Sequence, residues 1–178
     1  TGNNAGVFGR IAFLIFILLF GITTARQTVA SLKKVRRAEE LEQFALNDSM
    51  TGIYNRRGFY KNVRKLISKA EKQSVGVWVF SIDMDNLKKI NDLYGHNEGD
   101  KAIKAVASLM TKCTAEGGIC SRFGGDEFVA VIAETDGADS FYEKVSRSIA
   151  EYNRRSKSPY DVSISCGYKA GKPKTLKE

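Results

Sequence analysis

The feature that most constrains this chain is a glycine pair followed by two acids, set between two apolar runs. Residues 119–123 and 128–133 have the composition of two consecutive β-strands. Gly124 and Gly125 between them suit a tight reversal, because glycine tolerates positive φ. The pattern therefore predicts a β-hairpin. Its tip presents two adjacent carboxylates, Asp126 and Glu127.

A second acidic segment lies upstream, at the end of an apolar run. Residues 75–82 are rich in β-branched and aromatic side chains and predict a buried strand. The run ends in Asp83, and acids there are costly unless a cation or a donor meets them. If this strand lies beside the hairpin, Asp83 meets Asp126 and Glu127, and three carboxylates in one place call for a divalent metal. Without the second segment, a solvated hairpin tip would be the better interpretation.

Further segments complete a recognisable set that occurs in one order along the chain. From about Asp48 to Tyr168, this set resembles the GGDEF family of diguanylate cyclases in order and spacing. One such motif would be a weak match, whereas several in the right order are very specific. The segments are 48–57 (DSMTGIYNRR), 83–85 (DMD), 91–96 (NDLYGH), 99–100 (GD) and 122–128 (RFGGDEF).

The apolar periodicity predicts the elements that carry these segments. Helices are expected at 57–71, 85–94, 100–113 and 140–152, and another alternating strand at 162–167. The order β-α-α-β-β-α-β indicates an α/β sandwich with an antiparallel or mixed sheet. The resemblance implies the same class, a nucleotide-cyclase-like sandwich with a central, mostly antiparallel sheet.

The resemblance also implies a reaction. Diguanylate cyclases join two GTP molecules into cyclic di-GMP and release pyrophosphate, each 3′-hydroxyl attacking the α-phosphate of the other nucleotide. This chemistry needs a metal to neutralise phosphate charge, a base and two aligned substrates. One domain holds one GTP, so the resemblance implies a homodimer of facing domains and Mg²⁺ or Mn²⁺ as cofactor.

By resemblance, the acidic segments hold the metal. Asp83, the carbonyl of Met84, Asp126 and Glu127 correspond to metal ligands, and Asp126 also to the proton acceptor. Chemistry alone agrees that these carboxylates belong around a cation. It leaves open which of them takes the proton.

The remaining site residues concern the nucleotide. By resemblance, Lys88 meets phosphate, although a solvated helix lysine is the simpler interpretation of that residue alone. Asn91, His96 and Asp100 correspond to guanine-reading positions, with Asp100 accepting from N1–H and the exocyclic amine. On sequence alone, Asp100 could equally be a helix N-cap. The substrate site also includes the turn glycines, Gly124 and Gly125.

Other charged residues in the motifs are expected to be structural. Asp48 is predicted to pair with Arg56 or Arg57, and Asp85 and Asp92 are predicted to be structural or solvated. None of these five residues is assigned to the chemistry.

Two departures from the family matter. An inhibitory Arg-x-x-Asp site often ends five residues before the glycine pair, but residues 115–118 read Ala-Glu-Gly-Gly here. We therefore expect no product inhibition through that site. The family also continues past the last strand with a helix that carries Lys and Arg for the triphosphate. This sequence ends at Glu178, so we expect the C-terminal part to be truncated and GTP binding to be weak.

The N-terminal part predicts a membrane anchor and a linker. Residues 11–22 are apolar except for one glycine, and with their neighbours approach the ~20 residues that span a bilayer. A signal peptide and a buried helix are the alternatives, but basic residues follow the run and no cleavage pattern does. We predict a transmembrane segment at 1–26, the last of a longer receptor that begins before Thr1. The basic flank places the 48–178 catalytic domain in the cytoplasm, at the inner membrane.

Residues 27–47 are predicted to form a signalling helix. Its apolar stripe suits either a coiled coil with a second copy or a simple amphipathic linker, and the pattern alone does not separate them. The stripe consists of Val29, Leu32, Val35, Ala38, Leu41 and Ala45.

Composition excludes some functions. The net charge is +8, yet no motif that reads DNA or RNA accompanies it, so we expect no nucleic-acid partner. His96 is the single histidine, which argues against a histidine triad or zinc site. Cys113, Cys120 and Cys166 lack metal-binding spacing and are expected to be free thiols.

Two rival functions remain, namely a catalytically silent GGDEF module that binds GTP or proteins and a membrane-anchored scaffold.

Overall fold

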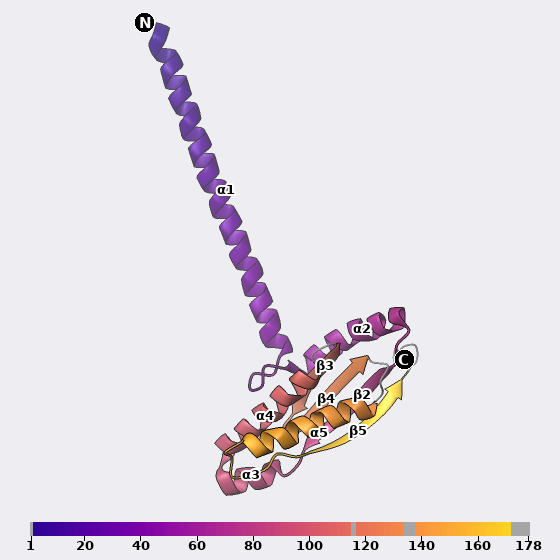
Figure 1. Cartoon of the computed structure of the whole chain (residues 1–178). Coiled ribbons are helices and arrows are strands. Elements are labelled where there is room, and N and C mark those ends of the chain that lie inside the picture. The colour runs from indigo at the N-terminus through magenta and orange to yellow at the C-terminus, as the bar shows by residue number, and fades with distance from the viewer. Residues whose placement is uncertain (1, 115–116, 134–137, 172–178) are drawn as a thin grey trace. The chain divides into compact units, whose positions relative to one another are not determined.

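The chain consists of two compact units. The computed structural model describes residues 2–114, 117–133 and 138–171. The units are Thr1–Gln43 and Phe44–Glu178, each with its own internal contacts. Figure 1 shows the first as a single helix and the second as a sheet with helices.

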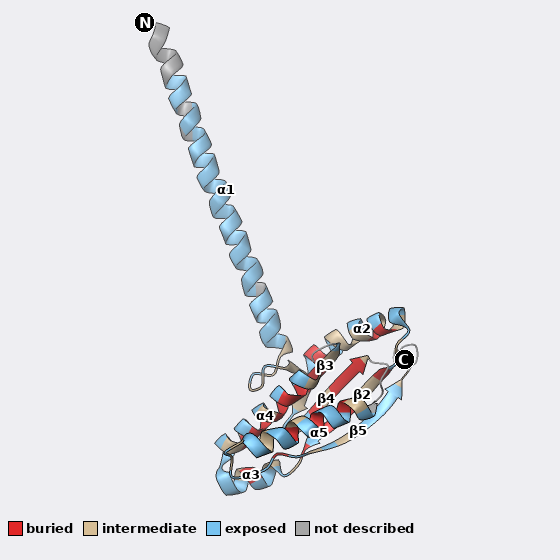
Figure 2. Ribbon diagram, in the orientation of Figure 1, coloured by how far each residue is buried: buried red, intermediate tan, exposed pale blue. Residues whose placement is uncertain are grey.

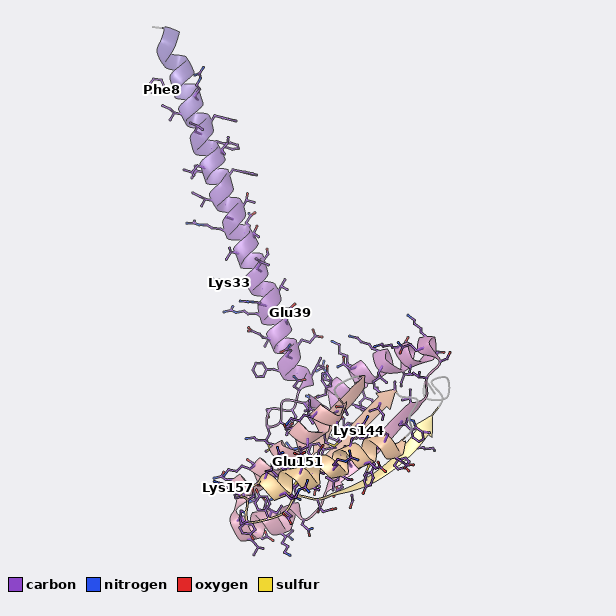
Figure 3. The ribbon with its side chains drawn as sticks, in the orientation of Figure 1. Phe8, Lys33, Glu39, Lys144, Glu151 and Lys157 are labelled. Carbon is purple, nitrogen blue, oxygen red and sulfur yellow. The ribbon has the colours of Figure 1, made fainter. Side chains whose placement is uncertain are left out.

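The first unit lies within one long helix, α1 (Gly2–Leu46). The helix runs without a break through the segments predicted as membrane span and linker. Figure 2 shows it exposed along its described length, and large apolar side chains such as Phe13 and Leu14 are more than half exposed. Figure 3 shows the side chains radiating around it, with Phe8 in the apolar part and Lys33 in the charged part. Within the described residues, α1 alone is long and apolar enough to cross a bilayer.

The second unit is built on a five-stranded sheet in the order β1-β3-β4-β2-β5. Neighbouring strands are antiparallel, except that β1 pairs in parallel with β3. This arrangement confirms the predicted α/β class with a mixed, mostly antiparallel sheet. The strands are β1 (Tyr54–Asn55), β2 (Val77–Met84), β3 (Gly118–Gly124), β4 (Glu127–Ala133) and β5 (Ile164–Gly171).

Alternation along the central strands divides the core between the two faces of the sheet. On one face, Phe80, Ile82 and Phe128 pack with α4 (His96–Thr114) and α5 (Ala138–Arg155). Figure 2 shows buried residues along both helices on the sides turned toward the sheet. Burying such large apolar side chains stabilises the fold by about 1.5–3 kcal/mol each.

The opposite face carries one helix, α2 (Arg56–Gln73). Phe59 of α2 packs near Val77 of β2 and Val131 of β4. Asn55 is the N-cap, since its side chain accepts from the Gly58 N–H at 2.9 Å. An N-cap of this kind stabilises the folded state by about 1 kcal/mol.

The observed elements differ from the predicted ones mainly at one helix start. The helix expected from residue 100 begins earlier, at His96. Gly95 (φ 86°) ends the preceding helix, α3 (Leu87–Tyr94). Its carbonyl then accepts from the N–H groups of Glu98 and Gly99, which starts the next helix. Asp100 therefore lies inside α4, and the N-cap interpretation of this residue is wrong. The short strand β1 was not predicted, because two residues carry no readable periodicity.

The three cysteines are free thiols, as predicted. Cys120 is buried, and burial raises the pKa of its thiol to about 12, so it stays protonated at neutral pH. Cys113 and Cys166 are half-buried.

Candidate active site

The predicted hairpin is formed by β3 and β4, and its turn holds the two glycines. Gly125 has a φ of 50°, a left-handed conformation that favours glycine, and the register shifts between Arg122 and Gly124. The Met84 N–H donates to the Asp126 carbonyl at 3.0 Å. This bond fastens the turn to the end of β2, so the hairpin and the upstream strand are neighbours, as predicted.

The β2–β4 register places Asp83 opposite Glu127. Ile82 and Met84, on either side of Asp83, are buried, whereas Asp83 itself is exposed. The reason is that alternate residues of a strand face opposite sides of the sheet. Both carboxylates thus lie on the face that carries α2, at the exposed end of the sheet.

The acidic groups at this end affect one another. Although Asp83 is exposed, partial loss of hydration of its carboxylate, and then the negative charges of Asp126, Asp85 and Glu127, raise its pKa. Within 2–114, 117–133 and 138–171, however, no three carboxylate, imidazole or thiol groups gather closely enough to hold a metal ion. The donor set of carboxylate and carbonyl oxygens suits Mg²⁺ or Mn²⁺, so the residues fit the cation chemically while their metal-binding role stays a prediction.

A largely buried arginine braces the turn. Arg122 donates from Nε and Nη2 to the Gly125 carbonyl, at 2.9 and 2.8 Å. Its Nη1 lies 3.1 Å from Oδ1 of Asp48, and its side chain is 10% exposed. Burial tends to raise the pKa of Asp48, but hydrogen bonds from Thr51 and Arg122 outweigh it and hold the pKa below its ordinary value.

This brace corrects one sequence prediction. Asp48 forms a structural ion pair, as expected, but its partner is Arg122 and the prediction of Arg56 or Arg57 is wrong. Both of these arginines are exposed on the first turn of α2, and the Arg56 guanidinium lies 5.6 Å from the centre of the Phe123 ring.

The corner between α3 and α4 holds the residues predicted to read guanine. Gly99 of α4 packs so closely on α3 that an added Cβ would collide with Oδ1 of Asn91. Asp100 follows Gly99 and is half-buried. The structure thus places Gly99, the residue before Asp100, against the Asn91 side chain, whereas His96 lies exposed at the start of α4.

The segment between β2 and α3 joins the two ends of the site. Asn86 reverses the chain with a φ of 59°, and Lys88 follows on the exposed first turn of α3. The Asp85 carboxylate accepts from the Ser165 hydroxyl at 2.7 Å. Asp92 is exposed, as predicted.

The window of the expected inhibitory site is described only in part. Ala115 and Glu116 lie outside the described residues, as do residues 172–178. At the last position of the window, a Cβ on Gly118 would lie 2.9 Å from Ile132 and 3.1 Å from Thr114. That position therefore has little room for a side chain.

Two contacts were not predicted from the sequence. Arg122 stands in the motif, but nothing in the sequence shows that it reaches both Asp48 and Gly125. Tyr160 lies far from any motif, yet its hydroxyl donates to the Glu98 carbonyl at 2.9 Å. Pairing between distant segments leaves no periodic signal that could have identified either contact.

Comparisons with known proteins identify the family to which this fold belongs. The family model described as "Diguanylate cyclase, GGDEF domain" matches residues 45–177. The diguanylate cyclase DgcM of Escherichia coli (strain K12) is 34% identical over 142 residues, which cover 76% of this chain and 34% of that protein. A diguanylate cyclase of Vibrio cholerae is 32% identical over 136 residues, covering 75% of this chain and 41% of that protein.

A solved structure has the same fold. The coiled coil and GGDEF domain of DgcB from Caulobacter crescentus, in complex with c-di-GMP, superposes with a TM-score of 0.70 at 23% identity. The match covers 85% of this chain and 83% of that one. The chain spans less than half of the length of the two cyclases compared above. With its family model matched across most of the sequence, this chain belongs to the GGDEF family of diguanylate cyclases.

Proposed function

We propose that this chain condenses two GTP molecules into cyclic di-GMP with release of pyrophosphate, using Mg²⁺ or Mn²⁺. The observation that carries the proposal is the fixed approach of the acidic groups. Asp83 lies opposite Glu127, and the Met84 N–H holds the Asp126 carbonyl. Membership of the family supports the class of reaction.

The acidic end is proposed to carry the proton and phosphate chemistry. Asp83, Asp126, Glu127 and the carbonyl of Met84 would hold the metal, and the metal would supply positive charge to neutralise the phosphates. Asp126, fixed at the turn, accepts the proton of the attacking 3′-hydroxyl. Arg122 acts only through the turn, by keeping the Gly125 carbonyl in place.

The remaining residues are proposed to bind and orient GTP. Gly124 and Gly125 are exposed, so phosphate can approach their backbone closely. Lys88, on the exposed first turn of α3, stabilises the charge that develops on the phosphates. At the other end, Asn91 and Asp100 contact the guanine edge, and His96 flanks it from the start of α4.

Two copies are needed, since each domain supplies one GTP. We propose that α1 provides the dimer contact through its exposed stripe around Leu32 and Val35. The apolar part of α1 is proposed to span the inner membrane, with the catalytic domain in the cytoplasm. No nucleic acid partner is proposed.

The test is conversion of GTP by the purified chain in detergent with Mg²⁺, scored as cyclic di-GMP by chromatography. Asp126→Asn should lower the rate about 100- to 10,000-fold, the usual contribution of a positioned base. Asp92→Asn, an exposed acid of α3, is the matched control and should leave the rate unchanged. GTP binding without product would favour the silent module, and full activity of Asp126→Asn would refute the assignment of the base.

A further inference from the structure

The connection between α5 and β5 is fastened to the α3–α4 corner. The Tyr160 hydroxyl donates to the Glu98 main-chain carbonyl at 2.9 Å and lies 3.1 Å from the Glu98 carboxylate. In the opposite direction, the Tyr94 hydroxyl donates to the Pro159 carbonyl at 3.1 Å. The two tyrosine rings lie 5.5 Å apart. Two tyrosines thus tie the segments together, one from each side.

The connection is itself fixed, so it can restrain what it contacts. Asn153 of α5 donates to the Val162 carbonyl at 2.8 Å and accepts from the Val162 N–H at 2.9 Å. Between these residues, the hydroxyls of Ser156 and Ser158 lie 2.7 Å apart. A hydrogen bond from such a segment limits the motion of its partner more than one from a free loop would.

The restrained carbonyl lies next to the base-reading residues. Glu98 directly precedes Gly99, whose backbone lies against the Asn91 side chain, and Asp100 follows. The Glu98 carboxylate has a second partner in Lys101, at 2.6 Å. A shift of this first turn of α4 would therefore change the spacing between Asn91 and Asp100.

We propose that Tyr160 is a positioning residue for recognition of the nucleotide base. Its hydroxyl holds the Glu98 carbonyl, and through it the first turn of α4, so that Asn91 and Asp100 keep the spacing that fits a guanine edge. The inference rests on the proposed function, because it concerns how the same site selects its base.

The test compares Tyr160→Phe with Tyr142→Phe, the same change at an exposed tyrosine of α5. Initial rates are measured with GTP and with ITP, which lacks the exocyclic amine of guanine. Dissociation constants are measured by calorimetry with 3′-deoxy-GTP and 3′-deoxy-ITP, which lack the attacking hydroxyl. For Tyr160→Phe, KM and Kd of the guanine nucleotide should rise about three- to tenfold, as for loss of one hydrogen bond. The kcat should stay within about twofold and the preference for GTP over ITP should narrow.

Each outcome decides a separate point. Unchanged affinity and unchanged preference in Tyr160→Phe, with only a lower melting temperature, would show that Tyr160 is a structural brace and overturn the inference. If the wild-type chain binds 3′-deoxy-GTP but makes no cyclic di-GMP, the proposed function fails while the dissociation constants still decide the role of Tyr160. A wild-type chain that does not distinguish the two bases overturns the inference. If Tyr160→Phe does not fold, Tyr94→Phe tests the same brace through Pro159.

Discussion

The two ends of the candidate site are held in place by different forces. At the hairpin end, acidic groups lie near one another, and partial loss of hydration together with their repulsion raises the pKa of Asp83. Main-chain bonds and Arg122 keep that turn in position. At the α3–α4 end, Gly99 packs on Asn91, the Tyr160 hydroxyl donates to the Glu98 carbonyl, and the Glu98 carboxylate pairs with Lys101. The comparison indicates that packing and hydrogen bonds hold the α3–α4 end in place, whereas the hairpin end keeps its acidic groups near one another against their mutual repulsion.

Apart from loss of the proposed base Asp126, the largest expected effect comes from a change at the α3–α4 end, where guanine is proposed to bind. Asp100→Ser should narrow the preference for GTP over ATP, because a carboxylate that faces guanine N1–H meets an acceptor in adenine. A mispaired contact of this kind is worth on the order of 2–4 kcal/mol, roughly a thirtyfold to thousandfold change in the ratio. The measurement is a competition between GTP and ATP that scores the dinucleotides formed.

Because Asp100 lies inside α4, a change in N-capping cannot account for the result. Asp161→Ser, at an exposed acid, serves as the control and should leave the ratio as it is. An unchanged ratio in Asp100→Ser would move the guanine contact elsewhere, with Asn91 as the next candidate.

The second effect concerns stability at the hairpin end. Arg122→Ala removes two hydrogen bonds to the Gly125 carbonyl and the ion pair of Asp48, which keeps only its bonds from Thr51. We expect a loss of about 2–3 kcal/mol in the free energy of unfolding, below the range for fully buried pairs because Asp48 is 22% exposed. Urea denaturation measures the loss, and Arg64→Ala, an exposed arginine of α2, should cause almost none. Equal urea midpoints for Arg122→Ala and Arg64→Ala would show that Arg122 does not stabilise the turn.

A smaller effect should appear at acidic pH. The pKa of Asp48 is lowered in the folded chain, so its contribution is present above the ordinary value of 3.8 and is lost as the pH falls through the lowered one. The stability difference between wild type and Asp48→Asn should be constant from about pH 7 to pH 5 and shrink below about pH 4. Urea midpoints over that range check the sign. A difference that grows on acidification would rule out the ion pair as its source.

The last prediction is that cyclic di-GMP does not inhibit the chain through residues 115–118. Residues 115–118 lack the arginine and the aspartate of the inhibitory motif, and Gly118 has little room for a side chain. We expect initial rates to be independent of added cyclic di-GMP at this site. Steep noncompetitive inhibition at micromolar product would reveal a substitute site.

The sequence predicted what depends on local pattern and missed what depends on distant pairing. The hairpin at Gly124 and the strand ending near Asp83 followed from alternation and turn chemistry, so the acidic end could be placed in advance. The start of α4 was missed because Gly95 both ends one helix and supports the next. Asp48 was given the wrong partner, since proximity along the chain says nothing about a contact made through the sheet.

The junction where α1 enters the second unit has a consequence for which substitutions it tolerates. The Asn55 side chain donates to the carbonyls of Ala45 and Asn47, at 3.1 and 3.0 Å, and Gly58 lies directly against the carbonyl of Leu46. These contacts use main-chain atoms of the helix end, so they do not depend on which side chains the helix carries. Changes to the side chains of residues 44–46 should therefore leave these contacts in place, provided that Asn55 and Gly58 are kept.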